Sequence, residues 1–152
     1  MSGSVDALWL DDIDVGSRYR TDDLVVTADD IVEFAGRYDP QPFHLSEAGA
    51  HGTVFGTLAA SGWHTAAITM RLLATSGIPI ATGIIGASIE LAWPTPTRPG
   101  DVLHVELVVT AVTHSRSKPD RGFVTCTYDT LDQQGSIRQH TTASLLAFRR
   151  PD

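Results

Sequence analysis

The chain has 152 residues, of which 42% are hydrophobic and 19% are charged, and its formal net charge at pH 7 is −7. This size and composition fit one globular domain, which we expect to cover residues 1–152 with its core at about 20–148. The acidic balance excludes a nucleic-acid partner, which needs a basic face, and disfavours binding to anionic membrane lipid.

The N-terminal segment, the lengths of the apolar runs and the cysteine content predict a cytoplasmic protein. The first 14 residues contain four aspartates but no basic start and no apolar stretch, unlike a secretory signal. No apolar run approaches the ~18 residues that a membrane span needs. The single Cys126 excludes an intramolecular disulfide and suits a reducing compartment. Because Cys126 lies in an alternating apolar and polar run, we expect its thiol to be buried.

The first elements predicted along the chain are a strand and a helix. Residues 18–26 resemble a short strand, and Thr27 offers an N-cap for the helix that follows. Apolar residues then recur at helical spacing, namely Ile31, Phe34, Ala35 and Tyr38. Pro40 and Pro42 end this helix, since the residue before a proline is pushed out of the helical region. Residues 39–44 are therefore expected to form a loop.

Two further helices are expected in the middle of the chain. Ser46 can cap a short turn that ends at Ala50, and a longer helix is predicted from about Ser61 to Thr75. Gly77 is a suitable C-terminal stop for the longer helix. Its expected apolar, core-facing side consists of Ala60, Trp63, Ala67, Met70 and Leu72 or Leu73.

The second half of the chain is rich in strand patterns. We expect strands at residues 84–93, 103–110, 123–131 and 137–148. Helices followed by a consecutive antiparallel sheet form an α+β pattern. A sheet wrapped around the long central helix is one economical way to bury both, although periodicity alone does not distinguish it from other α+β arrangements.

Three segments, taken in order, resemble the MaoC-like dehydratase or (R)-specific enoyl-CoA hydratase family. Residues 34–44 read Phe-Ala-Gly-Arg-Tyr-Asp-Pro-Gln-Pro-Phe-His, and the family loop reads Asp-x-Asn-Pro-x-His. Residues 55–62, Phe-Gly-Thr-Leu-Ala-Ala-Ser-Gly, resemble the family segment that leads into the buried helix. Residues 93–101, which end in Pro-Gly-Asp, resemble a family turn. The first segment is the most specific of the three.

The resemblance implies a hot-dog fold, in which an antiparallel sheet wraps around a long central helix. It also implies a homodimer or higher homo-oligomer and a thioester substrate carried by coenzyme A or acyl carrier protein, with no other cofactor. Two positions depart from the family. Gln41 stands where the motif usually has Asn, and Ser61 stands where many members carry His.

The resemblance assigns Asp39 and His44 as the catalytic pair, because a carboxylate and an imidazole on one loop can hold and activate a single water. Which of the two is the formal base stays open. The backbone amide of Gly62, at the expected start of the central helix, is predicted to bind the thioester oxygen. Ser61 would either cap the helix or contact the substrate.

The remaining polar groups give weaker signals. His44, His51 and His64 match no compact ligand spacing, so we expect no metal site. A basic cluster between two predicted strands is either a solvated hairpin tip or a contact for coenzyme A phosphates, made by Arg116, Lys118 and Arg121.

The sequence therefore predicts a hydro-lyase of fatty acid metabolism that adds water across a trans-2-enoyl thioester. One alternative is a thioesterase of the same fold. It is disfavoured because such enzymes generally carry their carboxylate on the central helix, and residues 62–75 contain no Asp or Glu. The other alternative is a non-catalytic protein that binds acyl thioesters.

Overall fold

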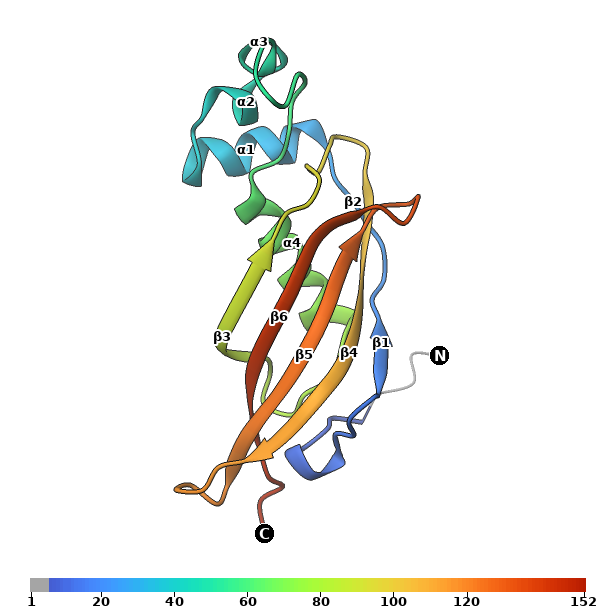
Figure 1. Cartoon of the computed structure of the whole chain (residues 1–152), viewed down its shortest axis with the longest axis vertical. Helices are drawn as coiled ribbons and strands as arrows, with labels where there is room; N and C mark the ends of the chain where they lie inside the picture. Colours follow the sequence, from blue (N-terminus) through green and yellow to red (C-terminus); the bar gives the residue numbers. More distant parts are fainter. Residues whose placement is uncertain (1–5) are drawn as a thin grey trace.

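The computed structural model describes residues 6–152, in which a long helix, α4, lies against one face of an antiparallel sheet (Figure 1). The helical elements are η1 (Leu10–Asp12), α1 (Ala28–Tyr38), α2 (Pro42–Leu45), α3 (Glu47–Ala50) and α4 (Gly62–Ser76). The strands are β1 (Arg18–Arg20), β2 (Leu24–Val25), β3 (Ile85–Ala92), β4 (Val102–His114), β5 (Arg121–Leu131) and β6 (Ile137–Phe148). This confirms the α+β class and the hot-dog arrangement.

The sheet has the strand order β1-β4-β5-β6-β3, and β2 pairs separately with β4. The single strand expected at residues 18–26 is wrong, because it is divided into β1 and β2. Thr21 interrupts it: its backbone amide donates to the Val105 carbonyl, and its hydroxyl accepts from the Val105 amide at 2.8 Å. The strands expected at 84–93, 103–110, 123–131 and 137–148 are all present.

Helices α1, α2 and α3 gather beyond one end of the sheet, near the start of α4 (Figure 1). Thr27 and Ser46 cap α1 and α3 as expected. The loop expected at residues 39–44 is partly wrong, because Pro42 begins the short helix α2. Proline suits the first position of a helix, where its missing N–H would have no helical partner.

The buried side of α4 differs from the apolar side that its sequence suggests. Trp63 and Met70 are exposed by 59% and 40% and Ala67 is exposed as well, which contradicts their predicted core positions. The buried residues are His64, Thr65, Ile68, Thr69, Leu72 and Leu73. Thr65 and Thr69 are accommodated because their hydroxyls form hydrogen bonds of 2.8 and 2.6 Å with the hydroxyls of Thr97 and Thr130.

The sheet buries alternate residues against α4, as in Leu103, Val105, Leu107 and Val109 of β4. Cys126 of β5 belongs to the same core and is fully buried, as predicted. Burial disfavours its thiolate and raises the pKa of Cys126 to about 11. No helix among residues 6–152 is long and apolar enough to cross a membrane.

A buried ion cluster joins three parts of the chain at the end of the sheet nearest α1–α3. Arg138 of β6 donates to Asp101 and Asp132, with N–O distances of 3.0 Å to each, and also to the hydroxyl of Thr95. Both carboxylates are almost fully buried. Such a pair depends on its counter-ion, because a buried charge without a partner is strongly unfavourable.

We expect Arg138→Met to lower the free energy of unfolding by about 3–5 kcal/mol, because it leaves two buried carboxylates without their cation. Urea unfolding of both proteins measures the loss. Arg37→Met is the matched control: Arg37 pairs with Glu33 at 3.9 Å on an exposed helix surface, and its replacement should cost less than about 1 kcal/mol. Equal losses for the two variants would contradict this interpretation of the cluster.

Candidate active site

The junction between α1 and α2 brings Asp39 and His44 together. Asp39 is the C-cap of α1 and His44 lies in α2, and Nε2 of His44 is 3.4 Å from Oδ2 of Asp39. Their side chains are exposed by only 6% for His44 and 17% for Asp39. The two residues predicted to act as a pair are therefore adjacent and largely shielded from solvent.

A carbonyl oxygen fixes the orientation of the His44 ring. Nδ1 of His44 lies 2.6 Å from the backbone oxygen of Ala59. A carbonyl oxygen only accepts hydrogen bonds, so Nδ1 carries the hydrogen. In the neutral ring Nε2 is then an acceptor, and it faces Asp39. The rings of Phe43 and Phe55 pack against His44 and help to hold this orientation.

Asp39 is held through both of its carboxylate oxygens. The hydroxyl of Ser61 donates to Oδ2 at 2.7 Å, and the amide of Gln41 donates to Oδ1 at 2.5 Å. Burial acts to raise the pKa of Asp39, but these two hydrogen bonds and the nearby His44 ring outweigh it. The pKa therefore lies below its ordinary value and the carboxylate is ionised at neutral pH.

A cavity of about 290 Å³ opens beside this pair. His44 and Gly62 both line it, as do Phe55, Ala60, Thr65, Trp93, Thr95, Pro96, Thr97 and Arg138. The indole of Trp93 lies against Gly62, and a Cβ at residue 62 would meet three indole atoms at 2.6–2.9 Å. The indole nitrogen donates to the buried side chain of Gln139 at 2.9 Å. Glycine is therefore required at position 62 for Trp93 to form this wall.

The first turn of α4 leaves one backbone donor free. The Trp63 amide donates to the Ser61 hydroxyl, and the amides of His64 and Thr65 donate to the Ser61 carbonyl. The Gly62 amide has no such acceptor among residues 6–152. An unpaired N–H at a helix N-terminus favours an anion or a developing negative charge. Gly62 therefore has the position and free donor expected of an oxyanion site.

The surroundings of Ser61 do not match the substrate contact considered above. Its side chain is fully buried, caps α4 by accepting from the Trp63 amide at 3.2 Å, and donates to Asp39. The cavity wall includes its neighbours Ala60 and Gly62 but not Ser61. The expected capping role is present, and the hydrogen bond to Asp39 was not anticipated.

Arg98 is a further residue of the site that sequence reasoning missed. Its guanidinium donates to the carbonyls of Phe55 and Thr57, each at 2.8 Å. These contacts hold the segment that carries Phe55 and leads to Ala59. The only local signal was the position of Arg98 inside the Pro-Gly-Asp segment, which gives no indication of its partners.

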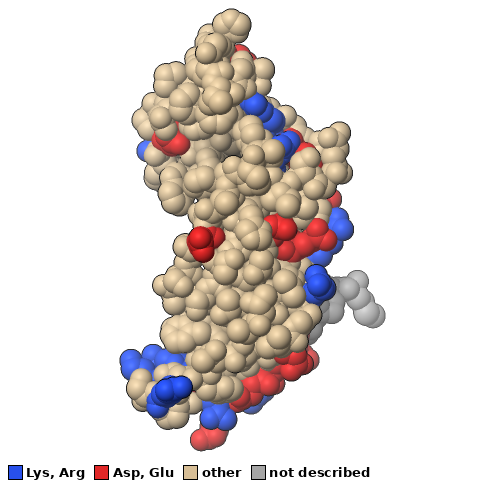
Figure 2. Space-filling model, viewed as in Figure 1, with Lys and Arg blue, Asp and Glu red and all other residues tan. Residues whose placement is uncertain are grey.

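The basic hairpin lies at the opposite end of the sheet from this site (Figure 1). Arg138 on the cavity wall and Phe148 opposite Arg121 are ten residues apart on β6, which corresponds to roughly 33 Å. Figure 2 shows basic side chains gathered at that lower end of the molecule. Arg121 pairs with Asp120 at 2.9 Å. The contact predicted between coenzyme A and Arg116, Lys118 or Arg121 stays a prediction.

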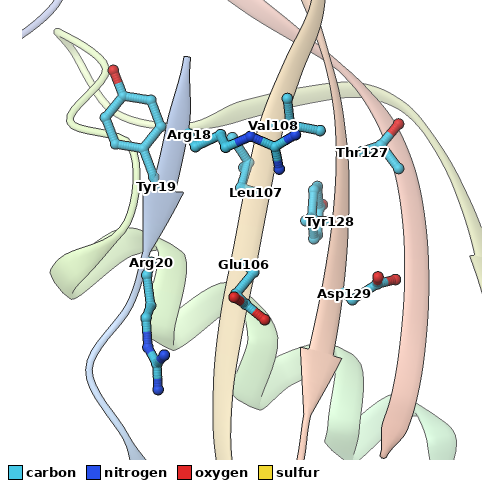
Figure 3. A pocket seen from close by; sticks show the side chains of 9 residues that line it. All are labelled: Arg18, Tyr19, Arg20, Glu106, Leu107, Val108, Thr127, Tyr128 and Asp129. Atoms are coloured by element: carbon cyan, nitrogen blue, oxygen red, sulfur yellow. The ribbon is translucent and has the colours of Figure 1, made fainter. Parts of the chain in front are cut away.

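A second concavity, of about 380 Å³, lies on the sheet away from α4, and neither Asp39 nor His44 lines it (Figure 3). Its charged side chains are Arg18, Arg20, Glu106 and Asp129. Glu106 lies opposite Arg20 on β1 and opposite Asp129 on β5, so it has a cation on one side and a second carboxylate on the other. Its lining contains no histidine and no helix N-terminus, whereas the first cavity combines His44 with the start of α4 at Gly62.

The other two histidines considered for a metal site differ in their surroundings. His51 is exposed, whereas His64 is buried and stacks on Phe34 with ring centroids 4.7 Å apart. Within residues 6–152 no cluster of three or more His, Cys, Asp or Glu side chains is arranged to hold an ion.

Comparison with known proteins agrees with this fold. The chain is 33% identical over 114 residues to a 3-hydroxybutyryl-CoA dehydratase of Methylorubrum extorquens (73% of this chain, 69% of the relative). It is 30% identical over 126 residues to an uncharacterised protein of Bacillus subtilis (82% and 88%). The crystal structure of a MaoC-like dehydratase from Rhodospirillum rubrum superposes with a TM-score of 0.94 at 59% identity, covering 96% of this chain and 100% of that one. The model of the MaoC-like domain matches residues 13–131, and the chain therefore belongs to the MaoC-like domain family.

Proposed function

We propose that this protein is an (R)-specific hydro-lyase that reversibly adds water across the double bond of a trans-2-enoyl-CoA to give a 3-hydroxyacyl-CoA. One observation carries the proposal: His44, whose Nε2 lies 3.4 Å from the Asp39 carboxylate, lines the same small cavity as Gly62, whose amide has no acceptor among residues 6–152. The kinship with a 3-hydroxybutyryl-CoA dehydratase supports a coenzyme A thioester as the substrate. The (R) configuration rests on the family resemblance.

The pair is arranged to bind one water. With a neutral His44 ring, Nε2 of His44 and Oδ2 of Asp39 are both acceptors, 3.4 Å apart. A water that donates one O–H to each directs a lone pair away from them, toward a substrate in the cavity. Holding the water in this orientation removes much of the entropic cost of the attack.

The proposed reaction has two steps. The water oxygen forms a bond to C3 of the enoyl group, one proton passes to the pair, and the π electrons move to the thioester oxygen as an enolate. The Gly62 amide stabilises that oxygen by a hydrogen bond that strengthens as the charge grows. The enolate then takes a proton at C2, and if the same proton returns, the addition is syn.

Hydration is favoured over thioester hydrolysis by the composition of α4. Residues 62–76 contain no Asp or Glu, so α4 offers no carboxylate to direct water at the carbonyl carbon. The carboxylate of this site comes instead from the end of α1. A non-catalytic binding role would leave the oriented ring and ionised carboxylate without a function.

We further propose that the protein self-associates through β3. This strand pairs on one side with β6 and forms an edge of the sheet, and both Ile85 and Ile89 are exposed on it. An exposed apolar edge strand is unfavourable unless another strand covers it.

We expect Asp39→Asn and His44→Ala to lower the rate of hydration by about 10²-fold or more, because the first replaces the negatively charged carboxylate by a neutral amide and the second removes the Nε2 acceptor. The assay follows loss of enoyl absorbance with crotonyl-CoA and with a longer trans-2-enoyl-CoA, and circular dichroism checks the fold. The matched controls are Asp29→Asn and His51→Ala, which replace exposed residues of the same types and should retain wild-type rates. Near-wild-type hydration by either site variant would refute the assignment, and release of free thiol would indicate a thioesterase.

A second prediction isolates the Gly62 amide. Gly62→Pro removes only this N–H from the helix start, and Ser61 at φ −54 and ψ 139 tolerates a following proline. Because any Cβ at residue 62 collides with Trp93, Gly62→Pro and Gly62→Ala are compared in a Trp93→Ala background. We expect kcat to be about 10²- to 10³-fold lower for the proline variant than for the alanine variant. Equal kcat values would show that Gly62 is not the oxyanion donor.

A further inference from the structure

The wall of the cavity beside His44 contains two hydroxyls that share a single hydrogen bond. Oγ1 of Thr65 lies 2.8 Å from Oγ1 of Thr97, and each residue is only 2% exposed. Two hydroxyls carry two hydrogens, and either oxygen can donate to the other. Whichever donates, the second hydrogen has no acceptor among residues 6–152. Because both residues line the cavity, one O–H donor of its wall is left for a ligand.

A second hydroxyl pair, one turn further along α4, is complete by comparison. Oγ1 of Thr69 lies 2.6 Å from Oγ1 of Thr130 and also donates to the Thr65 carbonyl at 2.8 Å. Thr130 therefore donates to Thr69, and both hydrogens of this pair have acceptors. Neither Thr69 nor Thr130 lines the cavity. Of the two pairs, the one that faces the cavity is the incomplete one.

Arg138 gives the same wall a second hydrogen without an acceptor. Its Nε and Nη2 donate to Asp101 and Asp132, and its Nη1 donates to the Thr95 hydroxyl at 3.0 Å. Nη1 carries two hydrogens, and the other one has no acceptor within residues 6–152. The cavity is therefore lined by one O–H and one N–H that can each donate to a bound molecule.

We propose that these donors bind a neutral oxygen on the acyl group, so that the preferred substrate is a trans-2-enoyl thioester whose chain carries a hydroxyl, ether or keto oxygen. This inference rests on the proposed hydratase function and names the class of its substrate. An apolar chain would displace water from both donors and leave them unpaired, which weakens binding. Thr65, Thr97 and Arg138 are then the residues that determine specificity.

The burial of the donors indicates that they face the acyl group and not the pantetheine arm. That arm must leave the cavity through its open side toward solvent. Thr65 and Thr97 are almost fully buried, and the side chain of Arg138 is 15% exposed. Donors on such an enclosed wall meet the part of the substrate that lies deepest in the cavity.

The charges of the wall favour a neutral oxygen over a second carboxylate. The guanidinium of Arg138 is already paired with both Asp101 and Asp132, so these three side chains together carry one negative charge. A substrate carboxylate would lose its hydration beside a cluster that is already negative, which is strongly unfavourable. A hydroxyl, ether or keto oxygen accepts the same hydrogen bonds without adding charge.

The test measures the preference for an oxygen at a fixed chain length. The cavity, at about 290 Å³, is roughly twice the size of one that holds benzene, so an acyl chain of about six carbons fits. The substrates are trans-2-hexenoyl-CoA, its 4-, 5- and 6-hydroxy derivatives, and trans-2-hexenedioyl-CoA, which ends in a carboxylate. We expect kcat/KM to be about tenfold or more higher for at least one hydroxy derivative than for hexenoyl-CoA. The carboxylate should be the poorest substrate.

The variant Thr65→Val/Thr97→Val removes both hydroxyls and keeps the side-chain shapes, so it leaves neither hydroxyl without its partner. We expect the ratio of kcat/KM for the preferred hydroxy substrate over hexenoyl-CoA to fall to about one. Thr69→Val/Thr130→Val is the matched control, because it removes the complete pair outside the cavity wall, and it should keep the wild-type ratio. An equal loss on every substrate, with the ratio unchanged, would overturn the proposal, since donors to the thioester oxygen or the pantetheine arm act on all substrates alike.

Binding of saturated analogues separates this proposal from the proposed function. Calorimetry compares hexanoyl-CoA with its 4-oxo, 5-oxo and 6-hydroxy derivatives. We expect at least one oxygenated analogue to bind wild type about tenfold more tightly than hexanoyl-CoA, and to lose this advantage in Thr65→Val/Thr97→Val. That result without turnover of any enoyl-CoA would support the oxygen site and count against the hydratase. Turnover with no preference for any hydroxy derivative, or equal binding of all analogues, would overturn the oxygen site alone.

Discussion

The site depends on the backbone N–H groups at the start of α4, which the helix itself cannot pair. The Ser61 carbonyl and hydroxyl accept from three of them, and the Gly62 amide on the cavity wall has no acceptor in the described part of the chain, residues 6–152. Through its own hydrogen, the Ser61 hydroxyl also holds Asp39. One helix terminus therefore organises both the predicted oxyanion position and the carboxylate, and both are favoured by the positive end of the same helix dipole.

The Asp39–His44 pair is close in sequence, but its geometry comes from elsewhere in the chain. The carbonyl that fixes the His44 ring belongs to Ala59, and the hydroxyl that holds Asp39 belongs to Ser61. Both lie in the segment that leads into α4, which Arg98 clamps from the turn before β4. The two prolines between Asp39 and His44 stiffen the backbone and place the two side chains only approximately. Contacts over 15 and 22 residues then set which nitrogen and which oxygen face each other.

These distant contacts explain what could be predicted from the sequence and what could not. Helix α4, its serine cap and the four long strands follow from local patterns, and the Asp39 and His44 positions follow from a motif of fixed spacing. The buried side of α4 was mispredicted because Thr65 and Thr69 are polar in the sequence and become buried only by pairing with hydroxyls of Thr97 and Thr130. Likewise, the sequence around Ser61 does not indicate Asp39 as its partner, and the sequence around Arg98 does not indicate Phe55. Spacing identifies which residues lie near one another, whereas hydrogen bonds between distant segments decide their roles.

The same arrangement accounts for the charge movement that the proposed reaction requires. At the start the pair carries one negative charge, on Asp39, and the substrate oxygen carries none. When the water attacks and its proton passes to either member, the pair becomes neutral overall and the thioester oxygen becomes negative. Asp39 reaches the α4 terminus through Ser61, and the thioester oxygen would reach it through Gly62. The helix terminus therefore faces one negative charge before and after the attack, so little reorganisation of the protein is needed as the transition state forms. This holds whichever of Asp39 and His44 accepts the proton.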